Sequence, residues 1–442
     1  MGTMFLKEKI SYYRQHWFVR NVATLQVGSF LGNFTQALIG VFVARILQPE
    51  KFGVYVLAMS LASLLSIFLA SGSQDAVSSL LGASYAKKDK IEVKEILAFF
   101  IKITLITSSI SLIGAVLAPW LASVFYQDPL IGFYAGVVVV AAMVSSFLFS
   151  ISSLVLQVAG KIKTMMVLGV VDQALRWGLS LFFVFMGFGI FGAVAGHLIG
   201  ATVVFLISYF MWARLKKEFP IFPSLRTLFK NIKKVSLKKY LGFSVWIAID
   251  RNVANLYLLL PVVLTGIYIS STEVTYFKLA FGYINLALSL LGPISILLNV
   301  EFPKMKVENS KSLPRNFIKV SVYSVIISTL ITAGVVIVAP IVFKVLYGEN
   351  FLPSVPYVAG LFVYGALYGI GVGLGPMWRA INKVKTSIII NLITLGLGIP
   401  LGLWLINSFG LWGTITMVTV WFTASHFVSF FYLMKHLKSD VA

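Results

Sequence analysis

The sequence contains no cysteine and few charged side chains. Among its 442 residues, 12% are Asp, Glu, Lys or Arg and four are histidines, whereas about 25% of the residues of a soluble domain are charged. Without cysteine there is no disulfide, thiolate nucleophile or cysteine-ligated metal site. The histidines lack metal-ligand spacing, and no phosphate-binding Gly-x-x-x-x-Gly-Lys-Ser/Thr loop is present. We therefore expect no cofactor and no metal centre, and no ATP hydrolysis unless a partner subunit supplies it.

Apolar runs of 20 or more residues recur along the whole chain, and hydrophobic residues make up 59% of it. Runs of this length cross a lipid bilayer as helices, and the two-residue alternation of membrane strands is absent. We therefore predict an all-α, multi-pass membrane protein. Turn residues and charges between the runs give about twelve spans, at residues 21–46, 52–82, 94–118, 130–156, 164–187, 190–213, 239–263, 273–300, 317–341, 355–378, 385–407 and 410–433.

Lysine and arginine outnumber the acidic residues, 36 to 15, and most of the excess falls on one side of the predicted membrane. When both termini and every second connection are placed on one side, that side holds 29 of the cations and the other side three. This is the positive-inside distribution, so we expect cytoplasmic termini, with an interfacial segment at residues 1–20 in place of a signal peptide and a tail at residues 434–442. The cations then contact anionic headgroups, and a nucleic-acid partner is not needed to explain them.

A basic segment near the middle of the chain, residues 214–238, predicts a cytoplasmic linker between an N-lobe (21–213) and a C-lobe (239–433). The two halves share short matches at a shift of 221–222 residues. These pair "GKIKT" from residue 160 with "NKVKT" from 382, "APWLASVFY" from 118 with "APIVFKVLY" from 339, and "FGIFGAV" from 188 with "FGLWGTI" from 409. Because six spans is an even number, both halves insert in the same orientation. The matches predict a parallel repeat of two six-helix bundles.

Charged residues within the predicted spans have no charged counterpart at the same shift. Asp250 and Arg251, for example, correspond to Gly28 and Ser29. Charges at this depth are costly, and they commonly mark a substrate or ion path. Our candidates for contact with a substrate in a central cavity are Arg251, Asp250, Arg176, Lys278, Arg45, Lys102 and Asn255, and our candidates for ion coupling or for pairing with the cations are Asp172, Asp75 and Asp250.

The two acid–arginine pairs differ in spacing. Asp250 and Arg251 are adjacent, so their side chains point about 100° apart on a helix and do not face each other. They either line a functional cavity or pair with the other lobe. Asp172 and Arg176 are four residues apart, and they form either a structural ion pair along one helix face or a cavity-lining pair.

The remaining candidates also have simpler interpretations. Lys102 and Lys278 lie near the ends of their spans, where a lysine can extend to the headgroups. Arg45 ends the first span as an interfacial anchor, and Asp75 lies in a polar stretch that can line water. His197 falls within a run of glycines at four-residue intervals, which predicts a packed, neutral side chain on a helix-packing face.

Two stretches resemble a known family. "FVARILQPEKFGVYVLAMSLASLL" resembles the first helix pair of polysaccharide flippases, with the pattern A-R-x-L-x-P-x-x-F-G-x-Y. "AIDR" followed by "EVTYFKLAFGYINLALSLLGPISILLNVEFPKMK" resembles their seventh and eighth spans. The family is the Wzx-type branch of the multidrug/oligosaccharidyl-lipid/polysaccharide (MOP) exporter superfamily.

This resemblance implies a V-shaped pair of six-helix bundles that moves polyprenyl-diphosphate-linked oligosaccharides to the outer leaflet by alternating access. It also implies cavity cations that meet the diphosphate, with Arg251 first and Arg176, Lys278 and Arg45 behind it. The expected setting is a monomer in the cytoplasmic membrane of a prokaryote, with polysaccharide polymerases or ligases as partners. Two alternatives stay open: a cation-coupled multidrug antiporter of the same superfamily, and a membrane-embedded polymerase or ligase. We expect a transporter and not an enzyme.

Overall fold

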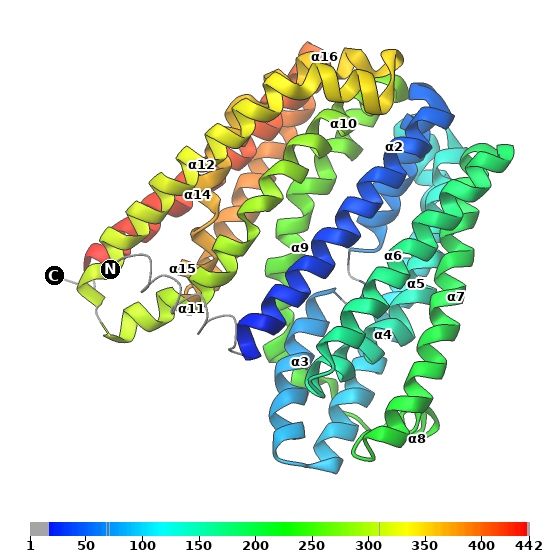
Figure 1. The fold of residues 1–442 in the computed structure, drawn as a ribbon, viewed down its shortest axis with the longest axis vertical. Helices are drawn as coiled ribbons and strands as arrows, with labels where there is room; N and C mark the ends of the chain where they lie inside the picture. The colour runs from blue at the N-terminus through cyan, green and yellow to red at the C-terminus, as the bar shows by residue number, and fades with distance from the viewer. Residues whose placement is uncertain (1–16, 68, 70, 309, 440–442) are drawn as a thin grey trace, which may run out of the picture. The chain divides into compact units, whose positions relative to one another are not determined.

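All regular structure in the described residues is helical, as predicted (Figure 1). The computed structural model describes residues 17–67, 69, 71–308 and 310–439, so most of the predicted N-terminal segment and the end of the tail lie outside it. The α-helices are α2 (Trp17–Leu65), α3 (Ser71–Ala86), α4 (Lys90–Tyr126), α5 (Pro129–Val158), α6 (Ile162–Phe183), α7 (Gly189–Glu218), α8 (Leu225–Asn231), α9 (Leu237–Tyr268), α10 (Ser271–Leu288), α11 (Gly292–Glu308), α12 (Leu313–Val342), α13 (Val355–Gly360), α14 (Phe362–Gly371), α15 (Leu374–Ala380) and α16 (Val384–Ser439).

Six helical stretches among the described residues are long and apolar enough to cross a membrane. A seventh is obtained if Glu349–Gly360 and Phe362–Ala380, which are bent by 52°, count as one span. Two of the six, Ile162–Glu218 and Val384–Leu437, contain 57 and 54 residues, and each covers two predicted spans. A multi-pass membrane protein is thus confirmed, while the count of twelve spans and the side of the termini stay predictions.

Three predicted spans are interrupted in the structure. The predicted second span, residues 52–82, is divided between α2 and α3, although the intervening "SIFLA" contains no proline or glycine that would indicate a break. The predicted eighth span, residues 273–300, passes through a 3₁₀ turn at Ser289–Leu291 just before Pro293. Proline has no N–H for the helical hydrogen bond and its ring clashes with the preceding turn, which accounts for this second interruption. The predicted tenth span, residues 355–378, is divided among α13, α14 and α15.

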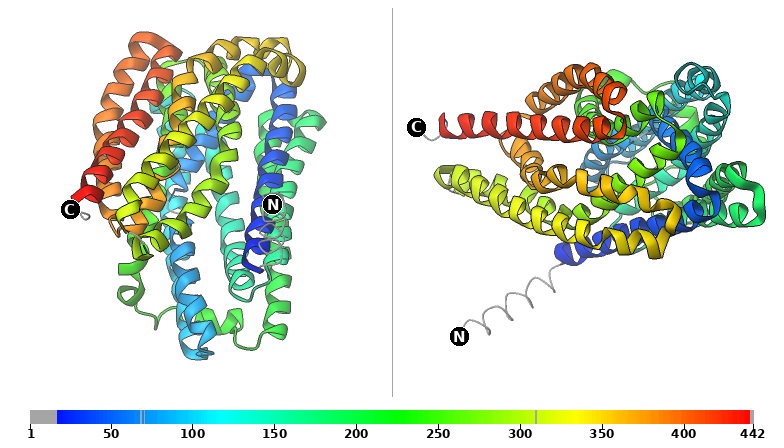
Figure 2. Two further views of the ribbon diagram at one scale, coloured as in Figure 1. Left: turned by 60° about the vertical axis from the view of Figure 1, so that its left-hand side comes forward. Right: turned by 90° about the horizontal axis from the view of Figure 1, so that it is seen from above.

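Matched turns in the two halves have the same backbone conformation. Gly189 has φ 57° and ψ −139°, and Gly410, 221 residues later, has φ 59° and ψ −136°. This conformation is open essentially only to glycine. Gly160 and Asn382, 222 residues apart, also share a left-handed backbone, with φ 73° and 58°. At Gly410 α16 turns back on itself, so that its orange and red arms run side by side (Figure 2). The sequence repeat is therefore also a repeat of local structure.

The chain forms two compact units. Unit 1 comprises the described residues of Met1–Val43, Leu69–Ile113 and Val137–Val245, and unit 2 those of Ala44–Phe68, Gly114–Gly136 and Trp246–Ala442. The units interleave along the chain, whereas the predicted lobes are continuous segments. The lobe boundaries stay a prediction.

The predicted linker, residues 214–238, packs into the core of unit 1. Phe222, Leu228 and Val235 are 2%, 0% and 7% exposed, and they belong to the same apolar cluster as buried residues of α4 and α5. Ser224 caps α8 by accepting a hydrogen bond from a backbone N–H in its first turn at 3.2 Å. The connection is therefore an ordered part of unit 1.

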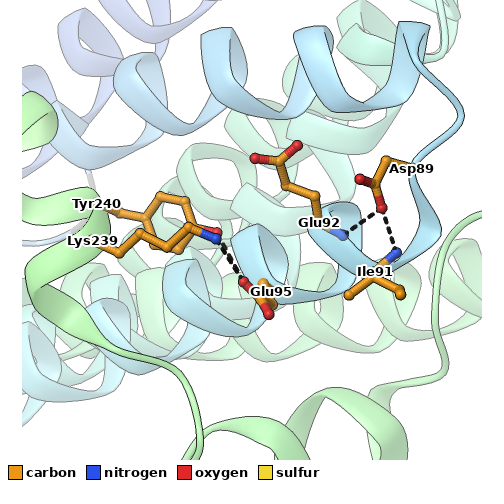
Figure 3. Close-up of polar contacts among 6 residues, drawn as sticks. All are labelled: Asp89, Ile91, Glu92, Glu95, Lys239 and Tyr240. Carbon is orange, nitrogen blue, oxygen red and sulfur yellow. Dashed lines mark hydrogen bonds and ion pairs between the residues drawn. The ribbon is translucent and has the colours of Figure 1, made fainter.

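Polar contacts join the first turns of α4 and α9 within unit 1 (Figure 3). Asp89 caps α4 by accepting hydrogen bonds from two backbone N–H groups at 2.9 and 3.0 Å. One turn into α4, Glu95 accepts from Lys239 Nζ at 2.9 Å and from the Tyr240 hydroxyl at 3.2 Å. The Tyr240 ring also packs against Phe99, with ring centroids 5.1 Å apart. These contacts fix the start of α9, the helix that carries Asp250 and Arg251.

In unit 2, α12 and α14 pack through small residues. Gly365 lies against the side chain of Thr332, and Gly369 lies so close to the backbone at Ser324 that a Cβ would overlap it. Ser328 Oγ donates to the Ala366 carbonyl of α14 at 2.6 Å. Small residues allow membrane helices this close approach.

Candidate functional site

Asp172 and Arg176 on α6 form an ion pair in unit 1. Arg176 Nη2 donates to Asp172 Oδ2, as the four-residue spacing allows. The Asp172 side chain is 5% exposed and that of Arg176 is 25% exposed. Asp172 Oδ1 and Arg176 Nε have no hydrogen-bond partner among the described residues. The pair is formed within one helix, and each member keeps a polar atom available for a further bond.

The glycine face of α7 brings that helix against the ion pair. Gly200 lies against the backbone of Arg176, and Gly196 lies against that of Ser180, so a Cβ at either position would overlap main-chain atoms. Between them, His197 is 4% exposed and forms a T-shaped contact with the Trp177 ring, with centroids 4.7 Å apart. His197 is thus a packed side chain, as the glycine pattern predicts.

Asp250 lines a pocket of about 270 Å³ that lies within unit 2. The walls come from α9, α14, α15 and both arms of α16. They combine charged or titratable groups with aromatic rings and hydroxyls. The residues that carry these groups are Asp250, Arg379 and His426, then Tyr257, Trp378 and Phe422, and then Ser387, Ser425 and Ser429, with Asn391.

Asn391 on α16 organises the polar wall of this pocket. The Ser425 hydroxyl donates to Asn391 Oδ1 at 2.5 Å, and the Tyr257 hydroxyl donates to the Asn391 carbonyl at 3.1 Å. Asn391 Nδ2 in turn donates to Ser387 Oγ at 3.5 Å. The hydrogen-bonding capacity of this wall is largely satisfied within the protein, so the wall is preorganised.

The carboxylate of Asp250 makes no hydrogen bond or ion pair to the described part of the chain. The positive charge that acts on it is that of Arg379, whose Nη1 is held by Asn299 Oδ1 at 3.1 Å. His426, half-buried on α16, lines the same space. The pocket therefore offers a carboxylate acceptor, a guanidinium donor and an imidazole to a ligand.

Arg251 and Asn255 do not line this pocket. Arg251 is exposed and Asn255 is half-buried on α9. The separation of Arg251 from Asp250 follows from the 100° step between adjacent helical residues. The structure thus assigns the two adjacent charges to different surroundings, and a substrate role for either stays a prediction.

The other candidates also lie apart from the pocket. Lys102 Nζ donates to the carbonyl of Val235 at 2.8 Å, so this lysine holds the linker segment against α4. Arg45 is exposed, and its Nη1 lies 3.5 Å from a backbone carbonyl of the same unit. Lys278 is half-buried on α10 and forms no hydrogen bond or ion pair with the described residues. The side chain of Asp75 lies outside the described part of the structure.

Arg379, Asn391 and His426 were not predicted as site residues from the sequence. In the sequence, Arg379 is one of three cations in a predicted cytoplasmic connection, so it is explained by topology. His426 and Asn391 lie within long apolar runs with no charged residue beside them. The available signal is "GVGLGPMWRAINK", in which glycines and a proline interrupt a span just before Arg379. Gly- or Pro-interrupted segments in transporters often form the binding site.

A sequence model of a family described as "Polysaccharide biosynthesis protein" matches residues 42–356. Among curated proteins, none matches this chain. Among solved structures, an inward-facing multidrug resistance MATE family transporter of the MOP superfamily is 17% identical, covers 93% of this chain and 96% of its own, and has a TM-score of 0.72.

Two further structures have similar coverage. A eukaryotic MATE transporter is 15% identical over 97% of this chain and 100% of its own, with a TM-score of 0.64. A MOP superfamily transporter from Pyrococcus furiosus, whose binding pocket is described as having reverse polarity that suggests a different function, is 16% identical over 97% of each chain, with a TM-score of 0.61. These likenesses show the fold: an all-α membrane transporter architecture over nearly the whole chain.

Proposed function

Because this chain belongs to the polysaccharide biosynthesis protein family and has the same fold as MOP-superfamily transporters, we propose that it is a flippase for lipid-linked oligosaccharides. Its substrate is a glycan attached to a polyprenyl diphosphate, which moves from the cytoplasmic leaflet to the outer leaflet by alternating access. The protein works as a monomer in the cytoplasmic membrane of a prokaryote. It delivers the glycan to polysaccharide polymerases or ligases.

The observation that carries this proposal is the placement of guanidinium groups within apolar helices. A diphosphate brings at least two negative charges, and guanidinium groups bind phosphate oxygens in a bidentate manner. Arg176 is paired with Asp172 but keeps an unused Nε. In the empty protein Asp172 neutralises Arg176, and in the loaded protein a phosphate oxygen accepts from N–H groups of Arg176 that Asp172 does not use.

Arg251 is our first choice for contact with the diphosphate. It is exposed on α9, a helix whose mean composition is apolar and whose start is anchored to α4 through Glu95. Moving an anion outward also follows an inside-negative membrane potential, by about 2.3 kcal/mol per charge per 100 mV. The potential thus assists the step that the cations make possible.

A second candidate function is cation-coupled multidrug antiport. Asp250 supports it, because its carboxylate lines a pocket together with the rings of Tyr257, Trp378 and Phe422. An organic cation is held by a carboxylate and aromatic faces. Arg379 in the same wall opposes such a ligand, which is why we rank this function second.

The test is reconstitution into liposomes with a fluorescent polyprenyl-diphosphate sugar, whose movement between leaflets is followed in time. We expect flipping by the wild type, a severe loss in Arg251→Ala, and a smaller loss in Arg251→Lys, which retains charge but not the bidentate fork. Lys217→Ala removes an equal charge from an exposed helix end and is the matched control.

Each alternative outcome has a defined meaning. Unchanged flipping in Arg251→Ala contradicts the role of that residue. If the wild type does not flip the lipid but expels a fluorescent cationic dye against a proton or sodium gradient, the antiporter is the correct function and the flippase proposal is wrong.

A further inference from the structure

A second pocket lies in unit 1, where α6 begins and α7 ends, and has a volume of about 340 Å³. It has a polar rim and an apolar wall. The rim consists of Lys161, Thr164, Arg214 and Glu218, and the wall of Leu156, Met211 and Leu215. None of these residues belongs to the sites described above.

Arg214 contributes an unused guanidinium to this pocket. It is exposed near the end of α7 and makes no hydrogen bond or ion pair with the described residues. Its neighbour Leu215 is 3% exposed and belongs to the core cluster of unit 1, so the backbone that carries Arg214 is fixed by packing. The five N–H groups of the guanidinium are available to an anion.

The single acid of the rim is already neutralised. Lys161 Nζ and Glu218 Oε1 lie 2.5 Å apart, and Lys161 Nζ also lies 5.6 Å from the centre of the Phe219 ring. With this pair formed, Arg214 leaves the rim with a net charge of +1. Lys216 and Lys217 lie in the last turn of α7 but do not line the pocket.

The pocket lies where the apolar stretch Ile162–Glu218 begins and ends. Lys161 and Glu218 lie at the two ends of the apolar stretch Ile162–Glu218, which turns back at Gly187–Gly189. Both ends therefore reach the same face, the one that the positive-inside bias assigns to the cytoplasm. An apolar wall below a cationic rim at this level matches a lipid whose headgroup is charged and whose chains enter the bilayer.

We propose that this pocket binds the phosphodiester headgroup of an anionic phospholipid of the cytoplasmic leaflet. Arg214 donates to the phosphate oxygens, Lys161 and Thr164 border the headgroup, and Met211 contacts the first acyl carbons. Basic pockets between membrane helices on the cytoplasmic side are suited to such headgroups. The site holds two helices of unit 1 together at their cytoplasmic ends, and its occupation does not depend on which substrate the protein transports.

The test uses the full chain, purified in detergent and stripped of lipid, with binding measured by native mass spectrometry and by the shift in thermal unfolding. The probes are phosphatidylglycerol, phosphatidylcholine and inorganic phosphate. We expect phosphatidylglycerol to bind and to raise the unfolding temperature more than phosphatidylcholine, which has the same phosphodiester but no net charge. Arg214→Ala weakens phosphatidylglycerol binding about tenfold, the effect of losing one charge-assisted group. Lys217→Ala, with the same loss of charge outside the pocket, changes binding less than twofold.

Three results overturn the proposal. Equal weakening by Arg214→Ala and Lys217→Ala shows general surface attraction and no defined site. Equal binding of phosphatidylcholine shows that charge is not selected. Stabilisation by inorganic phosphate as large as that by phosphatidylglycerol, with loss in Arg214→Ala, shows a site for the free anion. Because Arg214 is exposed, we expect the Arg214→Ala variant to fold normally. An unchanged unfolding temperature in the absence of lipid checks this.

Discussion

The ion pair of α6 predicts an asymmetry between its two members. Asp172 is 5% exposed and Arg176 is 25% exposed, so replacing either one leaves a charge in different surroundings. Arg176→Ala leaves a carboxylate buried without its partner, and breaking a buried pair in this way costs about 3–5 kcal/mol. Asp172→Asn keeps the volume and a hydrogen-bond acceptor, and the guanidinium that remains is 25% exposed. We therefore expect that change to cost only about 1–2 kcal/mol.

The double variant Asp172→Asn/Arg176→Ala distinguishes a charge effect from a packing effect. Removing both charges eliminates the uncompensated carboxylate, so the double variant is expected to be more stable than Arg176→Ala alone by about 1 kcal/mol or more. Stability is measured by unfolding the purified proteins in mixed micelles with increasing denaturing detergent, followed by tryptophan fluorescence. Arg176→Gln is included because it retains most of the volume of the arginine.

Two outcomes refute this reasoning. If Asp172→Asn is as destabilising as Arg176→Ala, the exposure difference does not govern the cost. If the double variant is less stable than both single variants, the pair contributes through packing against α7 and not through its charges.

Three further predictions follow from the backbone and the polar contacts. Gly189→Ala places a side chain at φ 57°, ψ −139° and is expected to lower the free energy of unfolding by about 1–3 kcal/mol. Gly178→Ala, in open space on a helix, is the control and is expected to be neutral or slightly stabilising. Both are measured by unfolding in mixed micelles, and equal losses would show that φ is not the cause. Lys102→Met removes the 2.8 Å hydrogen bond to the linker and should speed tryptic cleavage there, seen as faster loss of the full-length band; an unchanged rate contradicts its role as a tether. Glu95→Gln breaks the exposed ion pair with Lys239, whose side chains are 40% and 53% exposed. We expect it to lower the free energy of unfolding by less than about 1 kcal/mol, and the difference from wild type to shrink in high salt. A larger, salt-independent loss of stability would mean that the hydrogen bonds matter more than the charges.

The fold was largely accessible from the sequence because it depends on patterns that repeat many times. Apolar runs and the distribution of cations define a multi-pass helical protein without reference to any single residue. The internal repeat was visible for a local reason: Gly189 and Gly410 occupy a conformation that other residues avoid, so the chain keeps glycine at both places. The break between α2 and α3 was not accessible, since the five residues between the two helices include no proline or glycine.

The site was only partly accessible, because which side chains meet depends on contacts between distant segments. The spacing of Asp172 and Arg176 predicts their contact, since both lie on one helix. Asp250 was recognised as unusual, but its surroundings come from α15 and α16, more than 100 residues later in the chain. No local pattern links Asp250 to Arg379 or His426. For Lys102 the sequence suggested a role in substrate contact, because a lysine lies within an apolar run. In the structure its Nζ donates to a backbone carbonyl of the linker.

The packing of the linker has a consequence for how the protein is made. A ribosome that has completed residue 213 has synthesised all six predicted spans of the first half, yet the buried side chains of Phe222, Leu228 and Val235 are still missing. Tyr240, 4% exposed in the same apolar cluster, is supplied by the first turn of α9. The first half therefore reaches its final packing only after synthesis of the second half has begun, and a gene cut at the apparent boundary yields a fragment that lacks part of its own core.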